Sequence, residues 1–141
     1  PVLVSGFETD KQGLKMIGTA NFTLESDPKL ACTCDHDDCD QRTVNQATLV
    51  RLQVVRDIVE HGLSVTSGGR CPNHPNEVHR TQPADHQKRQ GVDVAVNGST
   101  RGNVVQAGIA AGFNAIGVAK TFVHLGYRGD SPGGHLTMWV Y

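Results

Sequence analysis

The stretch TVNQATLVRLQVVRDIVEHG, residues 43–62, constrains the fold most, because it is the clearest helical pattern in the chain. Thr43 can cap the helix through its hydroxyl group, and Gly62 offers a residue at which the helix can end. Between these two residues an apolar stripe recurs at helical spacing. The stripe comprises Leu49, Leu52, Val55, Ile58 and Val59. We therefore expect a helix that packs on a core and does not bind a partner.

The rest of the chain is divided into short elements. Sixteen Gly and six Pro residues favour many turns over a helical bundle. A second helix is expected over residues 99–112, where Ser99 or Thr100 can cap it and Gly112 can end it. Short strands are expected over residues 15–25, 63–67, 91–96, 113–119, 121–128 and 136–141.

These helices and strands mix without regular βαβ units. The pattern predicts an α+β fold, in which a small and mostly antiparallel sheet carries two main helices. In the first expected strand, Ile17, Ala20 and Phe22 are the inward positions. The length predicts one domain over residues 1–141, with residues 1–15 as an N-terminal extension.

Composition argues against two classes of partner. The formal net charge is −1, so no global field attracts nucleic acid or an anionic membrane. Aromatic residues make up only 5% of the chain, which argues against a platform for stacking bases. No apolar run approaches the roughly 20 residues that a membrane span needs. We expect neither nucleic-acid binding nor membrane insertion.

The first residues, PVLVSGFETDKQG, lack the basic region and the long apolar core of a secretory signal peptide. We therefore expect synthesis in the cytoplasm without a signal peptide. Action elsewhere would then depend on release by other proteins.

Four cysteines are unevenly placed, with Cys32, Cys34 and Cys39 in CTCDHDDCD and Cys71 in GGRCPNHP. Their spacing differs from the paired CxxC motifs of common zinc fingers. Together with His36 they can hold a structural zinc ion. Disulfide bonds to Cys71 are an equal alternative in an oxidising environment, and small buried residues are a third. The sequence leaves these interpretations open.

Three polar residues lie on or beside expected strands. His86 precedes the strand at 91–96, Asp93 lies on that strand, and His124 lies in the middle of the apolar strand at 121–128. Taken singly, each residue type more often has an ordinary core or surface role. Taken together, two imidazoles and one carboxylate would make a catalytic zinc site that leaves one position open for water.

The motifs VTSGGR, HQKRQGVDV and FVH resemble, in order and spacing, the zinc peptidases that cleave bacterial cell-wall peptides. That family comprises D-Ala-D-Ala carboxypeptidases and L-alanyl-D-glutamate endopeptidases, includes many phage endolysins, and has a hedgehog-like fold. Its Ser-x-His-x-x-Gly-x-Ala-x-Asp motif and a later His bind zinc. The resemblance implies Zn²⁺ ligands at His86, Asp93 and His124. It also implies that Arg70 binds a substrate carboxylate or stabilises the oxyanion, and the closing MWVY resembles the last strand of some members.

The chain departs from the family pattern at several positions. Ala84 replaces the Ser of the motif, Arg89 replaces its Gly, and Gly91 replaces its Ala. A positive φ at Arg89 would be costly, because only glycine adopts it freely. Gly126 stands where the family often has an Asp, two residues after the last zinc ligand.

The general base of the family, which accepts a proton from water, also has no counterpart at its usual position. Many members place an acid or a His two or three residues before the last ligand. Here Thr121 and Phe122 occupy these places, and neither can accept the proton. His135 is the preferred replacement as general base, because it adjoins a strand expected to pair with that of the last ligand. Asp130 and His79 are further candidates.

The resemblance implies a zinc-dependent peptidase that hydrolyses an amide bond of peptidoglycan stem peptides or cross-links. It also implies a phage-encoded protein that serves lysis or entry, at the bacterial cell wall or as part of a virion. Partners would be peptidoglycan peptides and other phage virion or lysis proteins. The alternative is a non-catalytic, zinc-containing virion or wall-binding module that keeps the peptidase fold. The missing acid near His124 favours this alternative.

Overall fold

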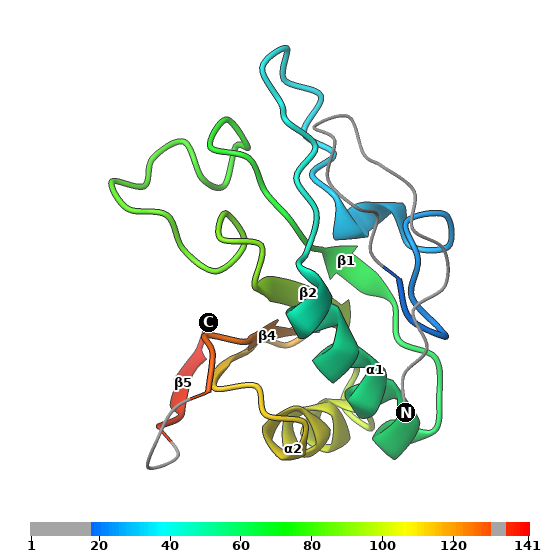
Figure 1. Ribbon diagram of the computed structural model, residues 1–141. Coiled ribbons are helices and arrows are strands. Elements are labelled where there is room, and N and C mark those ends of the chain that lie inside the picture. The colour runs from blue at the N-terminus through cyan, green and yellow to red at the C-terminus, as the bar shows by residue number, and fades with distance from the viewer. Residues whose placement is uncertain (1–17, 131–134) are drawn as a thin grey trace.

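A computed structural model describes residues 18–130 and 135–141 (Figure 1). The expected N-terminal extension lies outside these residues. The helices are α1 (Gln46–Val59) and α2 (Arg101–Ala110), with a short 3-10 helix η1 (Pro28–Leu30). The strands are β1 (Val65–Ser67), β2 (Gly91–Ala95), β3 (Ala115–Val118), β4 (Phe122–Gly126) and β5 (Thr137–Val140). The α+β fold with two main helices is confirmed.

The strands form one five-stranded sheet in the order β1-β2-β4-β3-β5. Neighbouring strands are antiparallel except for β3 and β5, which are parallel. Both central strands are five residues long, and their register places Asp93 of β2 opposite His124 of β4. The sheet is therefore mostly antiparallel, as the sequence predicts.

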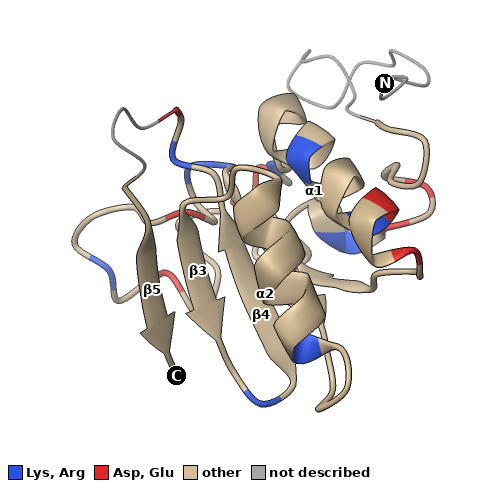
Figure 2. Ribbon diagram, turned by 90° about the horizontal axis from the view of Figure 1, so that it is seen from below, with Lys and Arg blue, Asp and Glu red and all other residues tan. Residues whose placement is uncertain are grey.

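The two faces of the sheet carry different side chains, because successive residues of a strand point to opposite sides. Val92, Val94, Val123 and Leu125 are fully buried and belong to the core that α1 and α2 cover. Figure 2 shows both helices against this face of the sheet. The intervening residues of β2 and β4 point to the opposite face, on the side where the long loops rise in Figure 1.

Helix α1 differs from its prediction at both ends. Its N-cap is Asn45, whose side chain accepts a hydrogen bond of 2.8 Å from the Thr48 backbone N–H, so Thr43 is not the cap. The helix ends at Glu60, in the left-handed conformation, before it reaches Gly62. Within the predicted stripe, Ile58 is an exception, since half of its surface is exposed.

The strand predicted over residues 15–25 is wrong for the part that the structure describes. Only an isolated bridge joins Gly18 to Thr23, although Phe22 is buried as expected. Ala20 is exposed, and Ile17 lies outside the described residues. The segment is instead bound to α1 through Gln53, which accepts from the Thr19 hydroxyl and the Asn21 N–H, at 2.9 Å each. Side-chain hydrogen bonds to a helix thus replace the pairing with a neighbouring strand.

Among the described residues, every helix is too short or too polar to span a membrane.

Candidate metal centre

The candidate ligands lie together on the open face of the sheet. Asp93 and His124 come from the paired central strands, while His86 comes from the loop that leads into β2. Asp93 Oδ1 lies 3.3 Å from His86 Nε2 and 3.0 Å from His124 Nδ1. One donor atom from each residue lies within 4.8 Å of the other two, and all three residues are buried. The structure therefore brings together the three residues that the sequence motifs single out.

The remaining nitrogen of each ring has its own acceptor. His86 Nδ1 lies 2.7 Å from the Gly68 carbonyl oxygen, and His124 Nε2 lies 2.9 Å from Asp85 Oδ2. When each ring donates its outer N–H to that acceptor, the inner nitrogen of the neutral ring presents a lone pair to the cluster. Fixed tautomers of this kind are what a metal-binding imidazole requires.

Asp85 is a site residue that the sequence motifs did not reveal. It is buried, and its carboxylate also accepts from Arg128 Nε at 2.9 Å and from Gln90 Nε2 at 3.0 Å. A Cβ at Gly126 would lie 2.7 Å from Asp85 Oδ2, so the glycine makes room for this carboxylate. A carboxylate from the loop before β2 thus lies beside Gly126, the position at which the family often has an Asp. In the sequence, Gly126 shows that the family carboxylate is absent at that position but does not locate a replacement.

The electrostatics of the cluster favour a cation. Burial acts to raise the pKa of Asp93, but hydrogen bonds from His124 and His86 outweigh it and hold that pKa below its usual range. Burial acts to lower the pKa of His124, but its bonds to Asp85 and Asp93 outweigh burial and raise the pKa. Two carboxylates therefore stabilise positive charge at the centre, whether a proton or a metal ion supplies it.

Arg70 lies at the same centre but has several protein partners. Its guanidinium donates to Asp93 Oδ2 and to Glu77 Oε2, at 3.2 Å each, and Nε donates to Ser67 Oγ at 2.9 Å. Glu77 is a second site residue that no motif revealed; it is almost fully buried and also pairs with Arg80 at 3.1 Å. Arg70 consequently holds the second oxygen of a candidate ligand.

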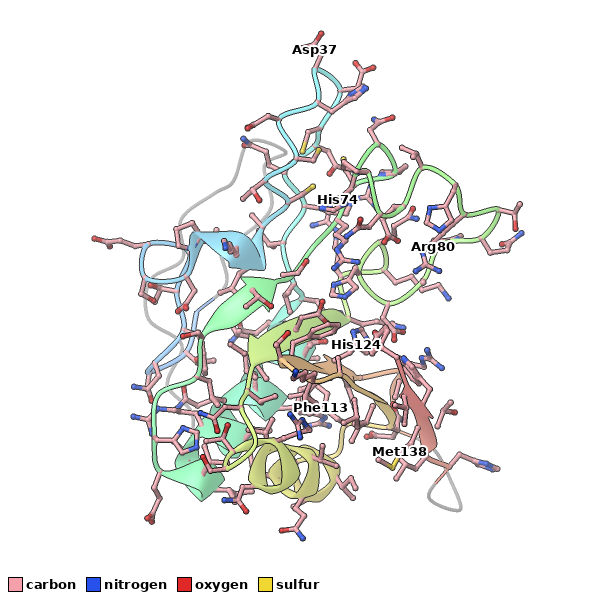
Figure 3. All side chains as sticks on the ribbon, turned by 180° about the vertical axis from the view of Figure 1, so that it is seen from behind. Asp37, His74, Arg80, Phe113, His124 and Met138 are labelled. Atoms are coloured by element: carbon pink, nitrogen blue, oxygen red, sulfur yellow. The ribbon has the colours of Figure 1, made fainter. Side chains whose placement is uncertain are left out.

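The centre opens into a cleft of about 540 Å³. The cleft is lined by Arg70, Pro75, Asn76, His79, Arg80, Ala84, Asp85, His86, Asp93, Phe122, His124, Arg128, Trp139 and Tyr141. Figure 3 shows Arg80 on the loop that overhangs the side of the sheet where His124 lies. Of the three residues considered as general base, His79 lines this cleft, whereas His135 and Asp130 line a separate pocket beside Phe113. The position of His135 gives no support to a role as base.

The end of the chain forms an aromatic wall beside the centre. The ring of Trp139 on β5 lies 5.4 Å from that of His124, and the ring of Tyr141 lies 5.0 Å from that of Phe122 in a tilted arrangement. A Cβ at Gly117 would lie 2.5 Å from Trp139 Nε1, so this glycine lets the indole lie flat over β3. The MWVY ending therefore contributes directly to the cleft.

The turn before β2 has the strain that the motif comparison anticipates. Arg89 has a φ of 65°, in the region where glycine is preferred. The conformation has a structural role, because the Arg89 carbonyl accepts a hydrogen bond of 2.7 Å from the Asn45 N–H. This bond joins the turn to the start of α1. Arg89 thus adopts a conformation that a glycine would adopt without strain.

The sequence matches the family model described as Peptidase M15 over residues 20–126, well over half of the chain. The chain belongs to the M15 peptidase family. The matched region includes the three candidate ligands and Arg70, and it ends at the last residue of β4. A comparison with curated proteins finds no match. M15 peptidases are zinc-dependent, and this membership identifies the protein as a zinc metallopeptidase.

The residues present in this M15 peptidase fit a zinc ion. His86, Asp93 and His124 offer two imidazole nitrogens and one carboxylate oxygen, a ligand set typical of catalytic zinc. Each His has an acceptor for its outer N–H, and Asp93 Oδ2 is held by Arg70. The inner atoms converge beside a cleft, so a substrate can approach the ion.

Proposed function

We propose that this M15 peptidase hydrolyses an amide bond in the stem peptides or cross-links of bacterial peptidoglycan. The supporting observation is the composition of the cleft. It combines the zinc ligands His86, Asp93 and His124 with three arginines and an aromatic wall. Peptidoglycan stem peptides carry free carboxylates, and an arginine can bind a carboxylate through two parallel hydrogen bonds.

We propose that different arginines of the cleft have different tasks. The side chain of Arg70 is only 12% exposed and is occupied by Glu77 and Asp93. It stabilises the metal ligand, and any contact it makes with substrate uses its remaining N–H groups. The side chains of Arg80 and Arg128 are 41% and 45% exposed, so they can reach a carboxylate of the bound peptide. These two residues are therefore the proposed substrate anchors, with Arg70 beneath them.

In this proposal the aromatic wall holds the peptide against the ligands. Trp139 and Tyr141 lie edge to face at 6.3 Å, and the Arg128 guanidinium lies 5.9 Å from the Trp139 ring. Flat rings of this kind pack on the short aliphatic side chains and backbone of a peptide. They also exclude water from one side of the cleft, which strengthens electrostatic interactions within it.

The residues of the chain supply the remaining steps of hydrolysis. Bound zinc supplies Lewis acidity, which lowers the pKa of a water molecule and polarises the scissile carbonyl group. We propose that His79 accepts the proton from that water and passes it to the leaving amine. His79 is an imidazole that lines the cleft outside the ligand cluster.

The resemblance to phage endolysins supports the narrower proposal of a phage-encoded enzyme. In that proposal the protein acts at the bacterial cell wall or within a virion, and other lysis or virion proteins bring it to the wall. A non-catalytic wall-binding module is the second candidate. Thr121 and Phe122 favour it, because these residues before His124 supply no proton acceptor.

Digestion of purified peptidoglycan tests both candidates. The protein is incubated with walls of several chemotypes, as metal-free and as zinc-reconstituted protein, and new free amino groups are measured. Zinc-dependent release that is lost in His124→Ala and retained in the control His61→Ala supports the peptidase. Stoichiometric zinc and wall binding without release of amino groups would refute it in favour of the binding module.

A role for His79 requires a separate measurement. We expect His79→Ala to lower kcat about 100-fold, as is typical for loss of a general base, without a change in zinc content. Unchanged kcat across the pH range would exclude His79 as the base.

A further inference from the structure

A second cluster of metal-binding side chains lies apart from the cleft. Cys32, Cys34 and Cys39 come from the loop between η1 and α1, and Cys71 comes from the turn after β1. The four Sγ atoms all lie within 4.8 Å of one another, and those of Cys34 and Cys71 are 3.5 Å apart. Figure 3 shows sulfur atoms between the loop of Asp37 and the segment of His74.

The spacing of the sulfurs suits one shared ion better than bonded pairs. A zinc ion with four thiolates at about 2.3 Å in a tetrahedron keeps its sulfurs about 3.8 Å apart. A disulfide instead joins two sulfurs at about 2.0 Å, much closer than the 3.5 Å between the sulfurs of Cys34 and Cys71. All four cysteines are free thiols, and they face a common centre.

The backbone around the cluster also suits thiolates. The Cys39 sulfur accepts a hydrogen bond from the Gln41 backbone N–H, two positions further along the chain, at 3.3 Å. Such N–H groups stabilise negative charge on sulfur and orient the ligand. This bond gives the cysteine loop a geometry that suits a metal ligand.

We propose that Cys32, Cys34, Cys39 and Cys71 bind a second zinc ion, which has a structural role. Two of these residues, Cys32 and Cys71, are buried, and none of the four is among the residues that line the described cleft. Four protein ligands also leave no position for water or substrate, which is typical of structural zinc.

The second ion would support the catalytic centre through the turn at residues 68–71. The Gly68 carbonyl accepts from His86, and the Arg70 N–H donates to the His86 carbonyl at 3.1 Å. The Arg70 side chain holds Asp93, as described above. Cys71 ends this turn, so an ion that binds it to the cysteine loop fixes the backbone behind two catalytic ligands. This inference concerns metal binding and folding, and it stands whether or not the protein cleaves peptidoglycan.

Metal analysis of the full chain tests the inference directly. Protein purified under reducing conditions is expected to contain two zinc ions per chain. Cys39→Ser and His124→Ala should each reduce this number to one, whereas the control Thr33→Ala, an exposed residue of the same loop, should keep both. One zinc ion in the wild type, lost in His124→Ala and kept in Cys39→Ser, would overturn the inference.

A second measurement avoids variants that fail to fold. Cobalt(II) added to metal-free wild-type protein should produce the strong sulfur-to-cobalt charge-transfer absorption of a tetrahedral thiolate site. That band should persist in His124→Ala. Its absence in the reduced wild type, or the finding of two disulfide bonds in protein that still binds one zinc ion and is fully folded, would refute the second site.

Discussion

The two clusters bring donor atoms equally close together but are built from different parts of the fold. Asp93 and His124 lie on paired central strands, and their separation is set by a register of backbone hydrogen bonds. The cysteines lie on two loops, and in the described residues the loop at 31–45 contains no named helix or strand. One centre is therefore positioned by the sheet, whereas the other is positioned by loops that the proposed ion would tie together.

The donor atoms of the two clusters also differ, in a way that fits these two kinds of support. Nitrogen and oxygen donors beside an open cleft keep a zinc ion Lewis-acidic and accessible, while four sulfurs close its coordination sphere. In the first centre the arrangement pre-exists because Asp85, Gly68 and Arg70 hold the ligands in place. We infer that a small fold can combine catalysis and stabilisation by assigning one to its strands and the other to its loops.

Loss of a ligand from the first centre should have the largest effect on activity. Loss of an outer partner typically lowers zinc affinity about 10–100-fold, and loss of the ligand itself should cost more. We therefore expect His124→Ala to lower both zinc affinity at the centre and hydrolysis of peptidoglycan by more than about 100-fold. Cys39→Ser should instead act mainly on the thermal unfolding midpoint. The contrast fails if His124→Ala unfolds the domain while Cys39→Ser leaves its midpoint unchanged.

An intermediate effect is expected at Asp85, which touches the first centre only through His124. Asp85→Asn keeps the size of the side chain but removes the negative charge that orients the imidazole. The affinity for zinc should fall by about 10–100-fold, measured by competition with a chelator. Asp130→Asn is the control, because its carboxylate is 92% exposed and lies in the other pocket. Unchanged affinity in Asp85→Asn would show that this carboxylate serves only to hold Arg128.

The contrast between Asp85 and the three proposed ligands shows how far the sequence could lead. The clustering of His86, Asp93 and His124 was predictable, because the order of the family motifs points to these residues. Asp85 was not, because its role depends on a loop that folds back to the space left by Gly126. The position of His135 in a separate pocket was unpredictable for a related reason. Its place next to a strand in the sequence does not say which face of the sheet its side chain reaches.

Other errors in prediction have the same origin. Both helices and the strands from β1 to β5 follow from local periodicity, and each was predicted to within a few residues of its position. The segment around Phe22 has the alternation of a strand, yet its polar groups bind Gln53 of α1. Likewise, no local pattern predicted that Glu77 would be buried between Arg70 and Arg80. Such contacts depend on tertiary packing.

A smaller, spectroscopic effect should distinguish occupancy of the two centres. Trp139 is the only tryptophan in the sequence, and its ring lies 5.4 Å from that of His124. Cobalt(II) in the first centre should therefore quench the fluorescence of Trp139, and occupancy of the cysteine cluster should quench it less. Titration of His124→Ala provides the control. Equal quenching in that variant and in the wild type would mean that the indole does not report on the first centre.

The smallest effects should come from backbone strain, which both centres contain. Arg89 in the turn before β2 and Gln41 in the cysteine loop have φ values of 65° and 54°. A left-handed conformation costs a residue with a Cβ about 1–2 kcal/mol, and glycine avoids this cost but loses about 0.5–1 kcal/mol more in chain entropy. We therefore expect Arg89→Gly and Gln41→Gly each to raise the free energy of unfolding by about 0.5–1 kcal/mol. Urea denaturation at fixed zinc concentration measures this change.

Glu60→Gly separates strain from metal binding. Glu60 has a φ of 61° at the end of α1 and belongs to neither cluster, so its gain should be the same with and without zinc. If the backbone at Arg89 and Gln41 is fixed by the fold alone, the gains at those positions should also be independent of zinc. A gain at Gln41 that appears only in zinc-loaded protein would show that the ion imposes this conformation, because the metal-free loop would then be free to relax. For Arg89, whose backbone N–H and C=O bond to His86 and Asn45, we expect no such dependence. The cysteine cluster would then differ from the first centre, because its backbone would adopt the final conformation only when the ion binds.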